Sequence, residues 1–162
     1  MKEFKIQDDG KTHINVFSKS RSVLGRLLSN FAHTPIEIEG VRFESIESWW
    51  YWVKMNNINN SGLFPIFADE QLDAVKTKIG IEAKEYFRSL YKHDTSSFNP
   101  TKDQLKEVYK LKLEAHPNIK EMLMNNNLPI DHYYVMFDKK VSAENTLWTA
   151  KLWEEIKVEC NK

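Results

Sequence analysis

Cysteine is nearly absent from this chain, because Cys160 is the only one among 162 residues. A single thiol cannot close an intramolecular disulfide, and it cannot build a cysteine zinc cluster. An excess of one charge is also missing, since 23 Lys and Arg residues balance 23 Asp and Glu residues. Binding that depends mainly on phosphate contacts needs a basic surplus, so the composition disfavours an electrostatic binder of nucleic acid or of membrane surfaces.

Long apolar runs are missing as well. No stretch approaches the roughly 20 residues that a membrane-spanning helix needs, and the start, residues 1–5, alternates charged with apolar side chains instead of forming a signal-peptide core. With one cysteine, these features predict a cytoplasmic protein. The length, the 41% of hydrophobic residues and the lack of a Pro, Gly or Ser-rich linker predict one compact domain over residues 1–162.

The common catalytic and nucleotide-binding motifs are not found. The sequence has no G-x-G-x-x-G, no G-x-x-x-x-G-K-[ST] and no G-x-S-x-G, which excludes the usual phosphate-binding loops and the nucleophile elbow. Its five histidines are scattered, without an H-x-x-x-H pair. Cys160 lies two residues from the end of the sequence, which suits a surface thiol better than a positioned nucleophile. We therefore expect no metal and no cofactor.

Short strands are expected near the N-terminus. Alternating apolar residues around Asp9-Gly10 predict a hairpin over residues 2–17, and Glu39-Gly40 predicts a second hairpin between residues 36–38 and 41–43. Residues 18–35 should be mostly loop or a short turn of helix. A buried strand is predicted at residues 132–137.

Helices are expected over most of the remainder. From Ser45 onward the apolar spacing changes from a period of 2 to 3.6, which is typical of amphipathic helices. The expected helices begin at Ser45, run through 72–79 and 83–91, begin near Thr101 with a capping box to Gln104, begin at Pro117, and run from about 143 through 156. The predicted fold is a predominantly helical α+β domain with short N-terminal hairpins and about six helices.

The Ser45 helix carries the residues of most chemical interest. Glu47, Trp50, Tyr51 and Lys54 lie at i, i+3, i+4 and i+7, so one stripe presents an anion, two aromatic rings and a cation. In the first turn the helix dipole favours an ionised carboxylate, so Glu47 should stay charged. Trp49 lies on the apolar stripe and should be buried, whereas Tyr51 should face a cleft. The alternative is a solvated face, with Glu47 present only for capping.

Three N-terminal segments match the pattern of a known family. They are the Asn-Val-Phe-Ser at residues 15–18, the run Leu-Gly-Arg-Leu-Leu-Ser-Asn-Phe-Ala-His-Thr-Pro-Ile at residues 24–36, and the Ser45 helix from Glu47 to Lys54. In this order they resemble the NADAR family, which includes riboflavin-biosynthesis-intermediate N-glycosidases and enzymes that remove ADP-ribose from modified bases. The C-terminal half continues the resemblance with residues 112–117, Asp131 to Val135, and Asn145.

The chain departs from the family pattern at two places. The family's Trp-Gly is Tyr134-Val135 here, and residues 136–141 replace a glycine-rich turn. Tyr134 still offers a ring on which a base can stack, but the loss of glycine removes close backbone approach to a phosphate or sugar.

The resemblance implies hydrolysis of an N-glycosidic bond in a ribosyl-phosphate or ADP-ribose conjugate, without a cofactor. Such a bond breaks through an oxocarbenium-like transition state, which calls for a carboxylate and for a proton donor to the leaving nitrogen. Glu47 suits the first role, and Asp131 is the candidate for the second. The candidate substrate-binding residues share ring faces, charges or amides suited to a nucleotide: Arg26, Asn30, Phe31, Trp50, Tyr51, Lys54, Tyr134 and Asn145.

Two other functions stay open. The chain could be a non-catalytic nucleotide-binding or protein-interaction module on the same fold, or a structural protein whose tryptophans only fill its core. The expected partner is a small-molecule or base-linked ADP-ribose or ribose-phosphate substrate. A nucleic acid is expected only as the carrier of a modified base, and no membrane is expected. The leaving group and the oligomeric state are left open.

Overall fold

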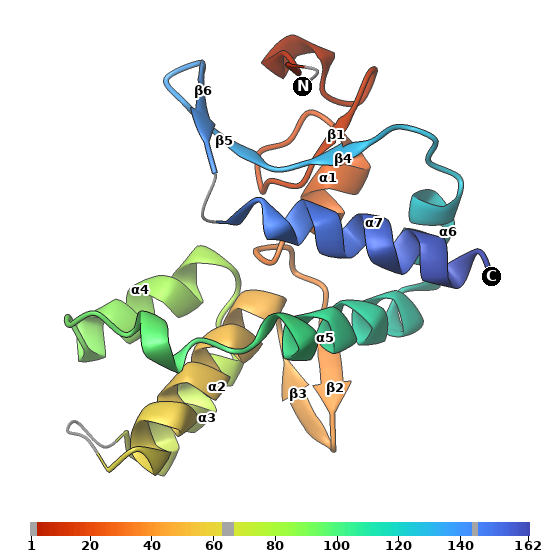
Figure 1. Ribbon diagram of the computed structural model, residues 1–162. Coiled ribbons are helices and arrows are strands. Elements are labelled where there is room, and N and C mark those ends of the chain that lie inside the picture. The colour runs from red at the N-terminus through yellow and green to blue at the C-terminus, as the bar shows by residue number, and fades with distance from the viewer. Residues whose placement is uncertain (1–2, 63–66, 144–145) are drawn as a thin grey trace. The chain divides into compact units, whose positions relative to one another are not determined.

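The computed structural model describes residues 3–62, 67–143 and 146–162. The fold is α+β and predominantly helical, as the sequence predicts (Figure 1). Contacts between Cα atoms divide the chain into two compact units, which we describe separately. Unit 1 comprises Met1–Ser29 and His116–Lys162, and unit 2 comprises Asn30–Ala115. Among the described residues, no helix is both long and apolar enough to cross a membrane.

Unit 2 combines four helices with one hairpin. Its elements in chain order are β2 (Ile36–Ile38), β3 (Val41–Phe43), α2 (Ile46–Asn60), α3 (Asp69–Lys76), α4 (Ile81–Leu90), the short 3₁₀ helix η2 (Ser96–Phe98) and α5 (Lys102–Ala115). β2 and β3 pair antiparallel across the Glu39-Gly40 turn, which confirms the second predicted hairpin. The longest helix, α2, packs against α3 and α4 (Figure 1).

The helix starts in unit 2 follow local hydrogen-bonding rules. The Ser45 hydroxyl accepts the Ser48 N–H at 3.2 Å, and the Ser48 hydroxyl accepts the Ser45 N–H at 3.1 Å, which closes a capping box at the start of α2. The predicted capping box of α5 is also present, with reciprocal bonds between Thr101 and Gln104.

Unit 1 joins the two ends of the chain through a short parallel sheet. Its elements are the 3₁₀ helix η1 (Ile6–Asp8), β1 (Ile14–Asn15), α1 (Val23–Leu28), α6 (Pro117–Met124), β4 (Ile130–Asp131), β5 (Tyr133–Met136), β6 (Lys139–Ser142) and α7 (Trp148–Cys160). β1 pairs parallel with β4, and α7 packs against β4 (Figure 1).

Several predicted elements of unit 1 are wrong. Residues 2–17 do not form a hairpin, because residues 6–8 are a 3₁₀ helix and β1 pairs with β4. The turn at Asp9 is held instead by its carboxylate, which accepts the N–H groups of Asn15 and Arg21 and the Ser20 hydroxyl. The strand predicted at residues 132–137 is present as β5, the first arm of the β5–β6 hairpin, but the prediction that it is buried is wrong, since only its Tyr133 is buried.

The bounds of some helices and the number of helices also differ from the prediction. The described residues hold seven α-helices, because residues 23–28 form α1 where a loop or a short turn of helix was expected. α3 ends at Lys76, before Ile79, and α7 begins at Trp148 instead of near residue 143. The Pro117 helix is confirmed as α6, which ends at Met124 with Asn125 as its C-cap.

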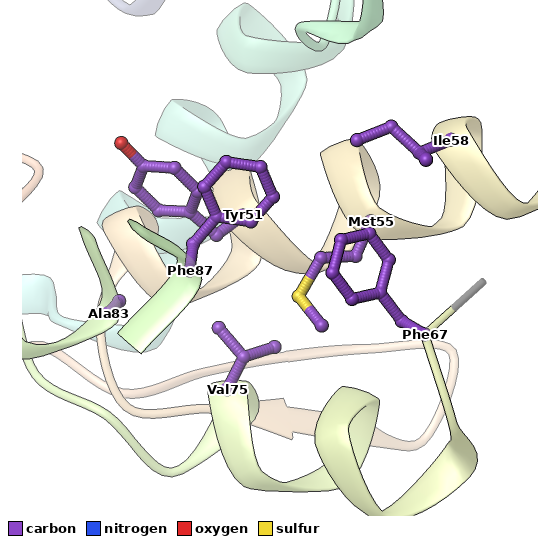
Figure 2. Close-up of a cluster of buried hydrophobic side chains, with 7 residues drawn as sticks. All are labelled: Tyr51, Met55, Ile58, Phe67, Val75, Ala83 and Phe87. Carbon is purple, nitrogen blue, oxygen red and sulfur yellow. The ribbon is translucent and has the colours of Figure 1, made fainter. Parts of the chain in front are cut away.

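A cluster of buried side chains forms the core between α2, α3 and α4. Its members are apolar or aromatic: Tyr51, Met55, Ile58, Phe67, Val75, Ala83 and Phe87. Figure 2 shows the Tyr51 and Phe87 rings side by side, with centroids 5.0 Å apart, and the Tyr51 hydroxyl at the end of the cluster away from Met55 and Phe67. Fully burying an aromatic side chain stabilises a fold by roughly 1.5–3 kcal/mol, so this cluster fixes the face that α2 presents.

Candidate functional site

Glu47 stands in the first turn of α2, held there by the Ser45 cap. Its backbone N–H donates to the carbonyl oxygen of Asn30 at 3.0 Å, which satisfies one of the N–H groups that a helix start leaves without an intrahelical acceptor. This bond ties the helix start to the Ser-Asn-Phe segment. Two of the predicted site residues are therefore neighbours in unit 2.

The carboxyl group of Glu47 titrates far from the usual range of a glutamate. Burial raises its pKa to about 7, against the opposing influence of the Lys84 and Lys54 charges. A pKa near 7 leaves the group partly protonated at neutral pH, where the sequence predicted a fully ionised carboxylate. The largest cause is desolvation of this half-buried side chain. Near neutral pH the group exchanges its proton readily, which is the property that a general acid or base requires.

The side chain of Asn30 is held from a second helix. The Tyr109 hydroxyl, on α5, donates to Asn30 Oδ1 at 2.8 Å. Tyr109 is fully buried; this burial, and next the charge of Glu47, raises its pKa, so the phenol keeps its proton. Asn30 is therefore anchored by α2 through its backbone and by α5 through its amide.

Tyr51 and Lys54 complete the stripe that begins at Glu47, but both are buried more deeply than expected. Tyr51 is 8% exposed and packs in the aromatic cluster, so the prediction that it faces a cleft is wrong. Lys54 is also 8% exposed, and its Nζ lies 5.4 Å from the centre of the Phe87 ring and 5.8 Å from that of Tyr51. Burial lowers the pKa of Lys54, although the nearby charges of Asp94 and Glu47 oppose this.

Trp49 takes the place that its helical position predicts, whereas Trp50, a predicted substrate-binding residue, packs partly into the core. Trp49 is 5% exposed and belongs to the core, as predicted. Trp50 is partly buried and packs against the aromatic cluster.

Phe31 is half-buried and lies against the turn before α4. There Gly80 has a φ of +51°, and a Cβ atom at this position would lie 2.7 Å from the Phe31 carbonyl oxygen. Only glycine accepts both conditions without displacement, so Gly80 fixes the position of Phe31.

The other predicted residues belong to unit 1. Arg26 is exposed, and its Nη1 donates to the carbonyl oxygens of Ser20 at 2.7 Å and Arg21 at 3.3 Å. Arg26 therefore stabilises the loop at Ser20 and Arg21, just before α1. Asn145 lies outside the described residues.

Asp131 is the last residue of β4, and Tyr134 lies in β5, three positions further along the chain. Asp131 accepts the His132 N–H at 2.9 Å, and it forms an ion pair with Lys140 at 3.9 Å. Tyr134 is 38% exposed, and its ring meets those of Phe17 and His132 edge-on. Its ring is thus partly available for stacking.

Two polar residues of α5 were not predicted as site residues, Tyr109 and Lys112. Both lie on the buried stripe of α5, one turn apart. Burial lowers the pKa of Lys112 to about 7. The sequence did carry a signal for them: a hydroxyl and an amine stand on the face where the spacing of Leu105, Val108 and Leu113 predicts apolar contacts.

We call the residues Asn30, Glu47, Tyr51, Lys54 and Tyr109 the Glu47 site. It offers a carboxyl group that titrates near neutrality, an anchored amide and a buried cation over aromatic rings. Among the described residues, no group of three or more His, Cys, Asp or Glu side chains could hold a metal ion. Comparisons of the chain with protein-family models, curated proteins and solved structures find no match, so the resemblance to the NADAR family stays a hypothesis.

Proposed function

We propose that this chain is an N-glycosidase that hydrolyses a ribosyl-phosphate or ADP-ribose conjugate at the Glu47 site. The observation that carries the proposal is the 3.0 Å bond from the Glu47 N–H to the Asn30 carbonyl oxygen, which brings a carboxyl group next to the anchored asparagine. Burial also raises the pKa of this carboxyl to about 7. Perturbed titration at a site with specific polar partners is a mark of catalytic residues. The NADAR resemblance supplies the class of bond.

In the proposed reaction, ionised Glu47 accepts one proton from a water molecule. The oxygen of that water bonds to C1 of the ribose as the bond from C1 to the base nitrogen breaks. The leaving nitrogen takes a proton from solvent, so the products are a free base and a ribose with a C1 hydroxyl. The negative charge of Glu47 also stabilises the oxocarbenium-like transition state.

Two residues of the Glu47 site, Asn30 and Lys54, have binding roles in this proposal, together with Phe31. The Asn30 amide hydrogen-bonds an oxygen of the sugar, and the Lys54 ammonium attracts a phosphate oxygen. Phe31 offers a ring for the base. The resemblance also implies substrate-binding roles for Arg26 and Tyr134 and proton donation by Asp131. These three residues belong to unit 1, and the reaction proposed at the Glu47 site does not require them.

The experiment is incubation of the protein with a panel of ADP-ribosylated bases and riboflavin-pathway intermediates, with the products read by mass spectrometry. We expect one class of conjugate to yield a free base together with a ribose phosphate or ADP-ribose. Loss of an intact phosphate instead, or no product from any conjugate at enzyme concentrations near that of the substrate, would overturn the proposal.

A further inference from the structure

Asn30 is held at two of its atoms, the backbone oxygen and the side-chain oxygen. Its backbone oxygen accepts the Glu47 N–H at 3.0 Å, and its Oδ1 accepts the Tyr109 hydroxyl at 2.8 Å. The two donors come from different helices, α2 and α5. Asn30 itself is only half-buried, so part of it stays open to solvent.

A side-chain amide carries one acceptor oxygen and one nitrogen with two N–H donors. In the structure the Tyr109 hydroxyl donates to Oδ1, so the amide is held with its oxygen toward Tyr109. In this orientation Nδ2 is the arm of the amide that does not face Tyr109.

We propose that Tyr109 is a positioning residue that fixes the Asn30 amide with Nδ2 toward the ligand, so that the site selects a hydrogen-bond acceptor there. The oxygen of a sugar ring or hydroxyl, or of a phosphate, meets this demand, whereas a group that only donates does not. The inference rests on the proposed function, because that function identifies the ligand as a ribose conjugate.

Two further observations support this role. Burial raises the pKa of Tyr109, so its hydroxyl stays a proton donor over the whole working pH range. The ring is fully buried on α5 beside Leu105, Val108 and Leu113, which are buried as well. A rigid donor on a packed helix orients its acceptor with little loss of entropy on ligand binding.

The test compares Tyr109→Phe with the matched variant Tyr86→Phe, which removes a hydroxyl from α4 outside the Glu47 site. Loss of one orienting hydrogen bond should raise the KM for the cleaved conjugate, and the Kd for ADP-ribose, by about tenfold. Turnover should change by less than about threefold, because Glu47 is untouched. Tyr86→Phe should leave both quantities at the wild-type values.

Nitrogen-15 NMR of the Asn30 side chain reports its orientation directly. In the wild type, the two Nδ2 protons should give one sharp pair of signals that shifts when ADP-ribose is added. In Tyr109→Phe, the pair should broaden or move toward the values of a solvent-exposed amide. A purely structural tyrosine would not change this response selectively.

The outcomes separate the two proposals. If the wild type neither binds ADP-ribose nor cleaves any conjugate, the proposed function fails and this inference fails with it. If the wild type does both, and Tyr109→Phe keeps KM, Kd and the Asn30 signals of the wild type, only the positioning role is overturned.

If Tyr109→Phe does not fold, Asn30→Asp decides instead. It keeps an oxygen for Tyr109 and replaces the Nδ2 donor by an acceptor. We expect it to lose ADP-ribose binding by more than about tenfold, and wild-type affinity would overturn the inference.

Discussion

The backbone N–H of Glu47 donates to the carbonyl oxygen of Asn30 across 3.0 Å. This bond joins the first turn of α2 to the Ser-Asn-Phe segment, the two features of the sequence that carry the strongest family resemblance. Because it is a bond between backbone groups, it places the two residues whatever their side chains do. Substitutions of the Glu47 side chain therefore test chemistry without removing the contact that positions it.

Glu47 should make the stability of the protein depend on pH. Its pKa is about 7 in the folded state, above that of an unfolded glutamate, so the folded state loses stability as pH rises from about 4.5 to about 7. Glu47→Gln removes this loss. We expect the variant to match the wild type near pH 4 and to be more stable at pH 8 by on the order of 1–3 kcal/mol.

Urea unfolding at several pH values measures this difference. The matched control is Glu85→Gln, which makes the same change at an exposed position of α4 and should show no comparable trend. A stability difference between Glu47→Gln and wild type that is constant from pH 4 to 8 would contradict a raised pKa.

The same titration should appear in catalysis. Because the proposed reaction needs ionised Glu47, kcat/KM should rise with pH below a midpoint of about 7 and level off above it. Rates measured between pH 5 and 9, on enzyme shown to be folded throughout, give the profile. A midpoint near 4.5 would mean that Glu47 is not the group that titrates, or that it is not buried.

Tyr51 should be a core residue and not a ligand contact. It is 8% exposed and packs against Phe87, so Tyr51→Ala should lower the free energy of unfolding by roughly 3–5 kcal/mol, as should Trp49→Ala. Tyr51→Phe keeps the ring and should stay close to wild type. Denaturant unfolding measures all three variants; a Tyr51→Ala variant as stable as wild type would show that the ring lies outside the core.

Gly80 should tolerate no side chain. At its φ of +51°, a Cβ atom would lie 2.7 Å from the Phe31 carbonyl oxygen, so Gly80→Ala should lower the free energy of unfolding by about 1–3 kcal/mol. Gly40→Ala is the control, since Gly40 has a φ of +79° with no atom within 4 Å of the new Cβ. If both variants lose the same free energy of unfolding, backbone strain alone explains the effect. The argument that Gly80 positions Phe31 then fails.

Local patterns in the sequence predicted the elements whose structure depends on near neighbours. The helix start at Ser45, the capping box at Thr101, the Glu39-Gly40 hairpin and the Pro117 helix start are all set by residues a few positions apart. The first hairpin failed because Ile14 and Asn15 pair with Ile130 and Asp131. A pairing across most of the chain leaves no trace in the alternation of residues 2–17.

The candidate site could also be predicted from the sequence only in part. Helical spacing placed Glu47, Tyr51 and Lys54 on one stripe, and in the structure the Lys54 ammonium lies 5.8 Å from the centre of the Tyr51 ring. The spacing could not predict how deeply these side chains are buried, because burial depends on which other helices cover the stripe. Here α4 supplies Phe87, which covers Tyr51 and Lys54. The desolvation that raises the pKa of Glu47 also depends on the folded chain, so the sequence could not predict it.

The most direct test of the proposed function is release of free base from the conjugate that the panel identifies, measured side by side for wild type, Glu47→Gln and Glu85→Gln. All three proteins should show the same circular dichroism and bind ADP-ribose. We predict that wild type and Glu85→Gln release base at equal rates, whereas Glu47→Gln is slower by at least about a hundredfold. Base release by Glu47→Gln at the wild-type rate would contradict the assignment of the reaction to Glu47.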